Sequence, residues 1–254
     1  MRLATFNILH GRSPADGRVD VSRFADAVRE LDADVLALQE VDRFLPRSAH
    51  ADLTAVAAAA MGAVDHRFVA ALDGSPGATW TAATGAEQPD SAGYGVALLS
   101  RHPVVAWEVV RLPELPGRGP WRWHGQRLPR LVRDEPRVAV AAQLETPAGC
   151  VTVANTHLSF LPYWNVRQLR RLVRALRDAR RPLVLTGDLN MGPRRAERLT
   201  GLASLATHAT FPAQRPERQI DHVLADGPVV AVDSAAHLLP LSDHLALVAD
   251  LDVG

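Results

Sequence analysis

The chain has 254 residues, of which 47% are hydrophobic and 22% charged, and its formal net charge is zero. These proportions are typical of a globular protein with a substantial core, and the neutral balance provides no overall attraction to nucleic acid or anionic lipid. A single cysteine excludes a disulfide framework and a cysteine zinc site. Because no apolar run is long enough to span a membrane or serve as a signal peptide, we expect a cytoplasmic protein, and no obligate protein partner is evident.

The first half of the chain combines apolar strands with helices that have one apolar face. We predict strands at 3–8, 34–40, 94–100 and 104–110 and helices at 21–31 and 51–61. Asp20 is placed to cap the first helix, and Gly62 to end the second. Residues 73–93 are rich in Gly, Ser, Thr and Pro, which predicts a long surface loop.

The second half begins with an irregular stretch, 112–136, which is rich in proline and arginine and contains Trp121 and Trp123. After it we predict a hairpin of strands 137–144 and 150–157, a helix at 166–179, a strand at 183–188, a helix opened by Gly192-Pro193, and strands at 219–224 and 244–251. No repeat or linker divides the chain. Residues 1–254 are therefore expected to form a single domain of two packed sheets with helices outside.

The most informative segment is Leu183-Val-Leu-Thr-Gly-Asp-Leu-Asn190, a buried strand that ends in a carboxylate and an amide. On an extended backbone, residues two apart point the same way, so Asp188 and Asn190 should face one spot. Such a pair can orient a water molecule and bind an oxyanion, as phosphate-ester hydrolysis requires. The segment alone is equally consistent with an Asx-rich turn that closes a strand.

Further polar side chains stand at the ends of other predicted strands: Asn7, Glu40, His157, Asp221, Asp243 and His244. Ligands gather outside strand ends in layered α/β proteins, so we expect these groups to converge. Asn7, Glu40 and Asp243 are hard oxygen donors that suit Mg²⁺ or Mn²⁺. The histidines fit proton transfer or hydrogen bonding to a phosphoryl oxygen, and Asp221 could orient His244.

Six short motifs carry these residues in one order: Thr5-Phe-Asn7, Leu38-Gln-Glu-Val41, Asn155-Thr-His-Leu158, Gly187-Asp-Leu-Asn190, Ile220-Asp-His222 and Ser242-Asp-His244. In this order the chain resembles the endonuclease/exonuclease/phosphatase superfamily, which shares the fold of pancreatic-type deoxyribonuclease. The resemblance extends from residue 3 to about residue 250. It implies an α+β fold, a four-layer α/β/β/α sandwich of two packed mixed β-sheets with outer helices and one pocket.

The resemblance also implies a role for each candidate. Asn7 and Glu40 would be the metal pair, with Asp243 as a further or water-mediated ligand. Asp188 would orient or deprotonate the attacking water, and Asn190 would hold the phosphate. His157 and His244 would bracket the scissile phosphate, with Asp221 as the partner of His244. Substrate-binding candidates are Arg137 near the phosphate, Tyr94 lining the site, and Asn155 supporting it. Whether one or two metals bind, and which histidine is the general acid, stays open.

We therefore predict a Mg²⁺- or Mn²⁺-dependent phosphodiesterase-like phosphoesterase that hydrolyses its substrate by in-line attack of water. The substrate class, a small molecule, a lipid head group or nucleic acid, is left open. One alternative is a metal-dependent deoxyribonuclease. Abasic-site endonucleases are disfavoured because they resemble this chain but carry a tyrosine in place of His157. An alternative from another class is a catalytically silent binding module on the same fold.

Arginines recur at a spacing of three to four residues along the predicted helix at 166–179 and just beyond it, at positions 167, 170, 174, 177 and 181. Such a stripe could track phosphates. A solvated helix face is the simpler interpretation, because the net charge is zero and no aromatic residues interleave.

Overall fold

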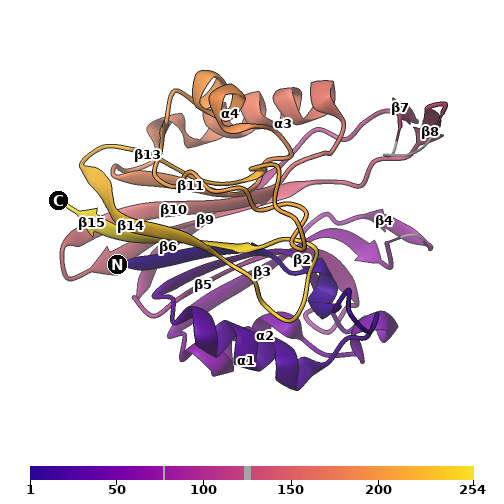
Figure 1. The fold of residues 1–254 in the computed structure, drawn as a ribbon, viewed down its shortest axis with the longest axis horizontal. Helices are drawn as coiled ribbons and strands as arrows, with labels where there is room; N and C mark the ends of the chain where they lie inside the picture. The colour runs from indigo at the N-terminus through magenta and orange to yellow at the C-terminus, as the bar shows by residue number, and fades with distance from the viewer. Residues whose placement is uncertain (77, 123–126) are drawn as a thin grey trace.

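The computed structural model describes residues 1–76, 78–122 and 127–254, and Trp123 lies outside the described residues. Two β-sheets pack face to face, and helices cover the outer face of each (Figure 1). Both sheets are mixed, since β1 runs parallel to β2 and β10 runs parallel to β11 while the other neighbours are antiparallel. This arrangement confirms the predicted four-layer α/β/β/α sandwich.

The first sheet has seven strands. Their order across the sheet is β14 (Val229–His237), β15 (Ala246–Val253), β1 (Arg2–Asn7), β2 (Val35–Arg43), β5 (Gly93–Ser100), β3 (Asp65–Gly74) and β4 (Trp80–Ala82). Successive residues of β2 enter different cores: Val35 and Ala37 pack between the sheets, while Leu36 and Leu38 pack against the helices. Both faces of the strand are therefore apolar, as expected for a sheet covered on both sides.

The second sheet has six strands. Their order is β12 (Ala203–Ser204), β13 (Asp221–Asp226), β11 (Leu183–Asp188), β10 (Gly149–His157), β9 (Val138–Thr146) and β6 (Val104–Arg111). The predicted hairpin is β9 and β10, which pair in antiparallel register around the turn. A separate ribbon of β7 (Gly119–Trp121) and β8 (Arg130–Val132) projects at the end of the sandwich (Figure 1).

Within the described residues, four α-helices form the outer layers: α1 (Val21–Leu31), α2 (Leu53–Met61), α3 (Pro162–Ala175) and α4 (Pro193–Thr200). The first two cover the seven-stranded sheet and the last two cover the six-stranded sheet. The shorter 3-10 turns are η1 (Leu9–Gly11), η2 (Pro46–Ser48) and η3 (Leu176–Asp178). In the part of the chain that the structure describes, no helix is long and apolar enough to cross a membrane.

Several strands were not predicted: β3 is one of them although it lies inside its sheet, and the others share a physical cause. The last part of the chain was expected to hold two strands, but β14 lies between them at the edge of its sheet, with Val230 and Val232 exposed. Likewise β4 lies inside the predicted loop 73–93, and β7 and β8 lie inside the irregular stretch 112–136. Edge strands and ribbons bury little apolar surface, so their sequences lack the pattern of a core strand.

Helix boundaries also differ from the prediction. Helix α3 begins at Pro162, four residues before the predicted start, and its regular part ends at Ala175 before η3. Proline is favoured in the first turn of a helix because its missing N–H group needs no partner there. Helix α2 begins at Leu53, because Asp52 caps it by accepting a hydrogen bond from the Ala55 N–H.

A polar contact joins the two sheets within the core. The Asn155 amide on β10 donates to the carbonyls of Leu38, at 2.9 Å, and Ala97, at 2.8 Å, and its oxygen accepts from Gln39 Nε2 at 2.7 Å. Asn155 and Gln39 are fully buried. Since buried polar groups are costly unless paired, this set of bonds fixes how one sheet is placed on the other.

Replacing Asn155 by Ala should therefore destabilise the protein. The variant removes three buried hydrogen bonds, two to carbonyls of the opposite sheet and one from Gln39, which should lower the free energy of unfolding by on the order of 2–4 kcal/mol, measured by urea denaturation. The matched control is Thr146→Val, which removes one hydrogen bond, to the Gly149 carbonyl, at the exposed hairpin turn. A loss for Asn155→Ala no larger than for this control would contradict the role of the cross-sheet contact.

Candidate active site

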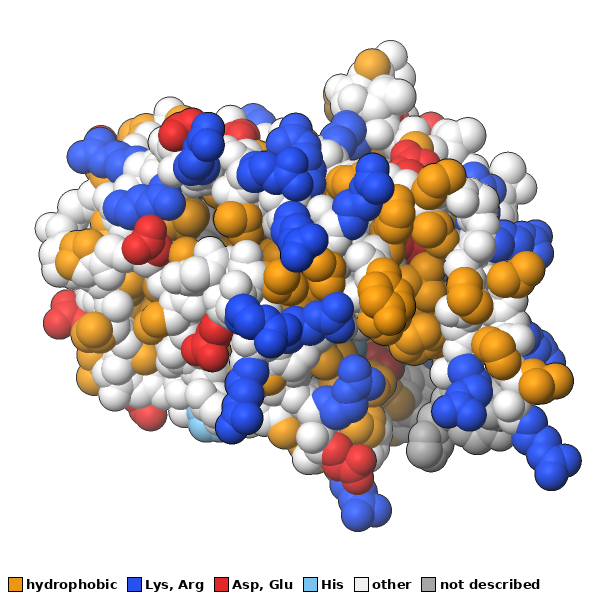
Figure 2. All heavy atoms as spheres, turned by 90° about the horizontal axis from the view of Figure 1, so that it is seen from above, with side chains coloured by type: hydrophobic (Ala, Val, Ile, Leu, Met, Phe, Trp, Pro, Cys, Tyr) orange, Lys and Arg blue, Asp and Glu red, His pale blue; other side chains and the backbone are white. Residues whose placement is uncertain are grey.

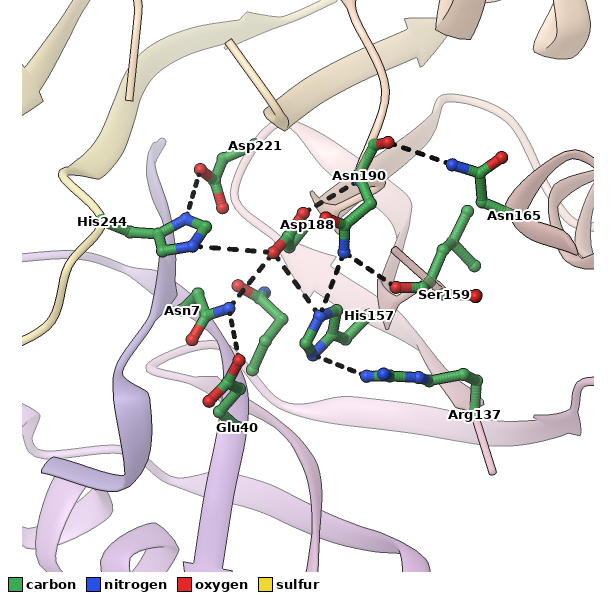
Figure 3. A network of polar contacts seen from close by, with 12 residues as sticks. Asn7, Glu40, Arg137, His157, Ser159, Asn165, Asp188, Asn190, Asp221 and His244 are labelled. Carbon is green, nitrogen blue, oxygen red and sulfur yellow. Dashed lines mark hydrogen bonds and ion pairs between the residues drawn. The ribbon is translucent and has the colours of Figure 1, made fainter. Parts of the chain in front are cut away.

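A cleft of about 970 Å³ opens at the end of the sandwich where strands of both sheets terminate. Seven of the predicted residues line it: Glu40, Tyr94, Arg137, His157, Asp188, Asn190 and His244. Asn7 and Asp221 lie beneath them, both buried, and contact the lining residues directly (Figure 3). The structure thus brings together side chains from β1, β2, β5, β10, β11 and β13, from the turn after β11, and from the segments that precede β9 and β15.

Asp188 lies at the centre because of the strand register. It is the last residue of β11, and it pairs with His157 across the parallel neighbour β10 and with Asp221 across the antiparallel neighbour β13. The preceding Gly187 permits this close packing: a Cβ there would lie 2.0 Å from the Thr156 carbonyl oxygen. A side chain at position 187 would therefore displace Asp188 from its neighbours.

Asn190 reaches the same spot as Asp188 by a route different from the predicted one. Its backbone is left-handed, with φ of 51°, and its N–H donates to Asp188 Oδ1 at 2.9 Å. The two side chains converge through an Asx turn, not along an extended strand, so the turn and the site are one structure. Asn190 Nδ2 donates to the Leu158 carbonyl at 2.9 Å and lies 3.3 Å from His157 Nε2.

Glu40 owes its position to a β-bulge. The register of β2 against β5 shifts between Gln39 and Val41, and Glu40 has φ of 56°. In a regular strand, Glu40 would follow Leu36 and Leu38 onto the helix-covered face. The extra residue instead lets Val41 take that place in the helix-side core, while Glu40 lines the cleft.

Asn7 links the two halves of the site. Its Nδ2 donates to Glu40 Oε1 at 3.1 Å and to Asp188 Oδ2 at 3.2 Å, so one amide bridges carboxylates from different sheets. Its oxygen accepts from the Leu9 N–H at 3.2 Å, which fixes the amide orientation because a backbone N–H can only donate.

His244 is paired with a carboxylate. Its Nδ1 lies 2.9 Å from Asp221 Oδ2, which also accepts from the Thr210 hydroxyl at 2.6 Å. Burial acts to lower the pKa of His244, but the Asp221 charge and hydrogen bond outweigh it and raise the pKa to about 10. The imidazolium therefore persists at neutral pH, with Nε2 3.9 Å from Asp188 Oδ2.

His157 has the opposite electrostatic environment. Burial and the nearby Arg137 guanidinium hold its pKa well below the usual value. Arg137 Nη1 lies 3.1 Å from His157 Nδ1, and because a guanidinium can only donate, Nδ1 must accept. The neutral ring therefore carries its proton on Nε2, 3.5 Å from Asp188 Oδ2. Arg137 is held in turn by Asp134 at 3.4 Å.

The acidic groups fit a hard divalent cation. Burial raises the pKa of Glu40, and the charges of Glu135 and Asp243 add to that effect. The pKa of Asp188 is raised as well, by burial and by the Asp221 charge. Carboxylates crowded in this way gain from a bound cation. Asp188, Asp221 and His244 also have possible ligand atoms within 4.8 Å of one another, but His244 could bind a metal ion only after losing its proton.

Two predicted residues do not reach the cleft. Asn155 uses both amide protons and its oxygen in the core, so it can support the site only from beneath, and we do not count it among the residues that contact substrate. Asp243 is partly buried but does not line the cleft, and it acts on Glu40 and His244 through its charge.

Other lining residues were not among the predicted ones. They come from loops and turns: His10, Arg47, Phe160, Phe211 and Arg218 among others. Phe211 packs against the His244 ring with centroids 4.9 Å apart. The sequence held a weak signal for His10, which follows Asn7 closely, and for the stretch 112–136, of which Trp121, Arg122 and Arg133 line the cleft. Loop side chains have no periodicity that would show which way they point.

Known proteins resemble the whole chain. Residues 4–244 match the Endonuclease/Exonuclease/phosphatase family. The crystal structure of an endonuclease/exonuclease/phosphatase from Beutenbergia cavernae DSM 12333 is 29% identical, with a TM-score of 0.73 over 100% of this chain and 72% of that one. No curated protein matches significantly.

Two more distant structures share the fold. The mannosyl-6-phosphatase Bt3783 of Bacteroides thetaiotaomicron is 17% identical, with a TM-score of 0.65 over 99% of both chains. The human Nocturnin catalytic domain with bound sulfate is 18% identical, with a TM-score of 0.62 over 100% of this chain and 94% of that one.

The two imidazoles should titrate differently in the metal-free protein. The pKa of His244 is raised, so its protonated form should prevail below about pH 10, whereas His157 should be neutral at pH 7. In Asp221→Asn the pKa of His244 should fall, and in Arg137→Gln the pKa of His157 should rise, because each variant removes the neighbouring charge. Nitrogen-15 NMR of the histidine rings measures both. Ordinary titration of His244 near pH 6.5 in the unaltered protein would contradict the assigned pair.

Proposed function

We propose that this chain, which belongs to the endonuclease/exonuclease/phosphatase family, is a Mg²⁺- or Mn²⁺-dependent phosphodiesterase that hydrolyses its substrate by in-line attack of water. Members of the family act on phosphoester bonds. The observation that carries the proposal is the surroundings of Asp188: one buried carboxylate with an imidazolium on one side and a neutral imidazole on the other.

Asp188 is the group that orients and activates water. Its raised pKa makes it a better proton acceptor than an exposed aspartate, and Asn7 and the Asn190 backbone hold its two oxygens in place. A carboxylate fixed by two donors can keep a water molecule aimed at phosphorus.

His157 and Asn190 form the binding site for a phosphoryl oxygen. Two N–H groups point toward the same region, since His157 Nε2 carries a proton and Asn190 Nδ2 has one proton beyond that given to Leu158. These two donor nitrogens are 3.3 Å apart, and neither can accept a hydrogen bond from the other. An anionic oxygen placed between them accepts a hydrogen bond from both. Arg137 keeps the proton on Nε2 by occupying Nδ1.

His244 stabilises negative charge. At neutral pH it is a cation held by Asp221, placed to attract the phosphoryl group next to Asp188. A proton held with a pKa of about 10 is transferred less readily at neutral pH than one with a pKa near that pH. We therefore assign both histidines to binding the phosphoryl oxygens, and neither to shuttling a proton.

Glu40 would hold the cation, together with Asn7. A bound divalent ion supplies positive charge to the oxygens of the phosphate group. The Asn7 amide presents its nitrogen to Glu40, and its oxygen would face the cation only if the amide turned over and gave up its bonds to the Leu9 N–H, Glu40 and Asp188. Asp243 adds negative charge nearby, and Tyr94 closes one wall of the cleft.

The protein should hydrolyse bis(p-nitrophenyl) phosphate with Mg²⁺ or Mn²⁺, and EDTA should abolish the activity. Asp188→Asn should lower kcat by roughly 10²–10⁴-fold, because it removes the group that activates water while keeping the shape of the side chain. Release of p-nitrophenol measures both effects. The control Asp178→Asn alters an exposed carboxylate far from the cleft, on η3, and should be neutral.

Absence of turnover with either metal, or an undiminished rate in Asp188→Asn, would overturn the proposal. A folded protein without turnover that still binds phosphate esters would instead be a binding module on the same fold.

A further inference from the structure

A second concave surface lies outside the cleft, on the helical layer of the six-stranded sheet. It is a groove of about 670 Å³ between α3, α4 and the segment after β6, and we call it the α3 groove. Its lining includes five arginines and one tyrosine: Arg167, Arg170, Arg171, Arg174, Arg195 and Tyr163. Figure 2, which shows this face of the molecule, has arginine side chains crowded at its centre.

The positive charge of the α3 groove is uncompensated locally. Helix α3 contains no acidic residue. Among the described residues, none of the five guanidinium groups lies within 4.0 Å of a carboxylate. The whole chain balances 28 basic with 28 acidic residues, so charge is segregated onto this face. Arginines that repel one another at helical spacing cost stability unless an anion binds between them.

Two of the arginines are held in place by the protein itself. Arg195 Nη2 donates to the Pro162 carbonyl at 3.1 Å, which joins α4 to the first turn of α3. Arg174 Nε donates to the Arg170 carbonyl at 3.1 Å. Ordered guanidinium groups lose less side-chain entropy when they bind phosphate.

The aromatic residues at the start of α3 indicate a ligand with exposed rings. Tyr163 is 88% exposed and lines the groove beside the arginines. Trp164 stacks with Arg167, whose guanidinium carbon lies 5.0 Å from the ring centroid. We expected no aromatic residues among these arginines, and the earlier start of the helix brings both in. Basic side chains together with an exposed aromatic ring are characteristic of single-strand nucleic acid sites.

An anionic membrane fits this surface less well. Helices that lie on membranes present large apolar side chains beside their basic ones. Here the leucines of α3 pack inward, with Leu169 and Leu172 fully buried. Val166 is only partly exposed and lines the groove.

The α3 groove adjoins the cleft along the chain. Phe160 lines the cleft, Tyr163 lines the groove, and the two are separated by Leu161 and Pro162 alone. Asn165 of the same helix donates to the Asn190 carbonyl at 3.0 Å, so the first turns of α3 are fixed to the candidate active site.

We propose that the α3 groove binds the phosphate backbone of a single-stranded nucleic acid. That such a strand is also the substrate of the cleft rests on the proposed phosphodiesterase function; binding itself does not. The groove thus favours the nuclease alternative over a small-molecule substrate.

The test compares two triple variants. Arg167→Gln, Arg170→Gln and Arg174→Gln remove charge from the groove, while Arg18→Gln, Arg29→Gln and Arg67→Gln remove the same charge from exposed positions outside the groove lining. Glutamine has nearly the helix propensity of arginine, and all six replaced side chains are exposed, so both variants should fold. The probe is a fluorescein-labelled oligothymidylate, and binding is followed by anisotropy in EDTA at several salt concentrations.

The groove variant should bind the oligothymidylate roughly tenfold more weakly or worse. The slope of its plot of log affinity against log salt concentration should be smaller in magnitude by about 2, since each of the three lost phosphate contacts contributes about 0.7 to the slope for a single strand. The control variant should match the unaltered protein. Equal weakening in both variants would show a general charge effect and overturn the proposal. Arginine-dependent binding to phosphatidylglycerol vesicles without binding to the oligothymidylate would also overturn it.

A second readout tests delivery to the cleft. With Mn²⁺, the groove variant should show a raised KM for the oligothymidylate and unchanged hydrolysis of bis(p-nitrophenyl) phosphate. Groove-dependent binding without hydrolysis of either compound would contradict the proposed phosphodiesterase and leave the nucleic-acid site established.

Discussion

The placement of one sheet on the other is the constraint on which the candidate site depends. Glu40 and Asn7 come from the seven-stranded sheet, whereas His157, Asp188 and Asp221 come from the six-stranded sheet. Apolar side chains between the sheets attract them but tolerate sliding, since hydrophobic burial has no direction. The bonds from Asn155 to Leu38, Ala97 and Gln39 do have direction, and they lie one or two residues below the candidate catalytic groups. The same amide therefore stabilises the core and aligns the site.

Around Asp188, neighbouring charges give the His244 and His157 imidazoles different protonation states. His244 faces Asp221 and keeps its proton, while His157 faces Arg137 and stays neutral. Both nonetheless present an N–H toward Asp188. The site thereby gathers donors for an anion without accumulating two cations, and the carboxylate between them remains available to water.

Local backbone irregularities place the groups that regular strands could not. Glu40 reaches the cleft through a bulge, and Asn190 through a left-handed residue in an Asx turn. Each of these conformations has a higher backbone energy than a regular strand. Such strained conformations concentrate at functional sites. The α3 groove has a similar character: like-charged arginines are brought together on one helix face, and the core beneath, not the groove itself, stabilises that helix.

The sequence by itself indicated two packed sheets with outer helices and the polar residues at strand ends, because apolar strands and their polar termini leave a periodic pattern in the chain, and the resemblance of its motifs to a known family implied the four-layer order. It could not show that Asn155 points into the core and not into the cleft, or that Phe211 and Arg218 line the site. It also left open which imidazole carries charge. Those features depend on register between strands, on bulges and on which charges face each ring. They are decided by contacts between residues far apart in the chain, and so only the tertiary structure fixes them.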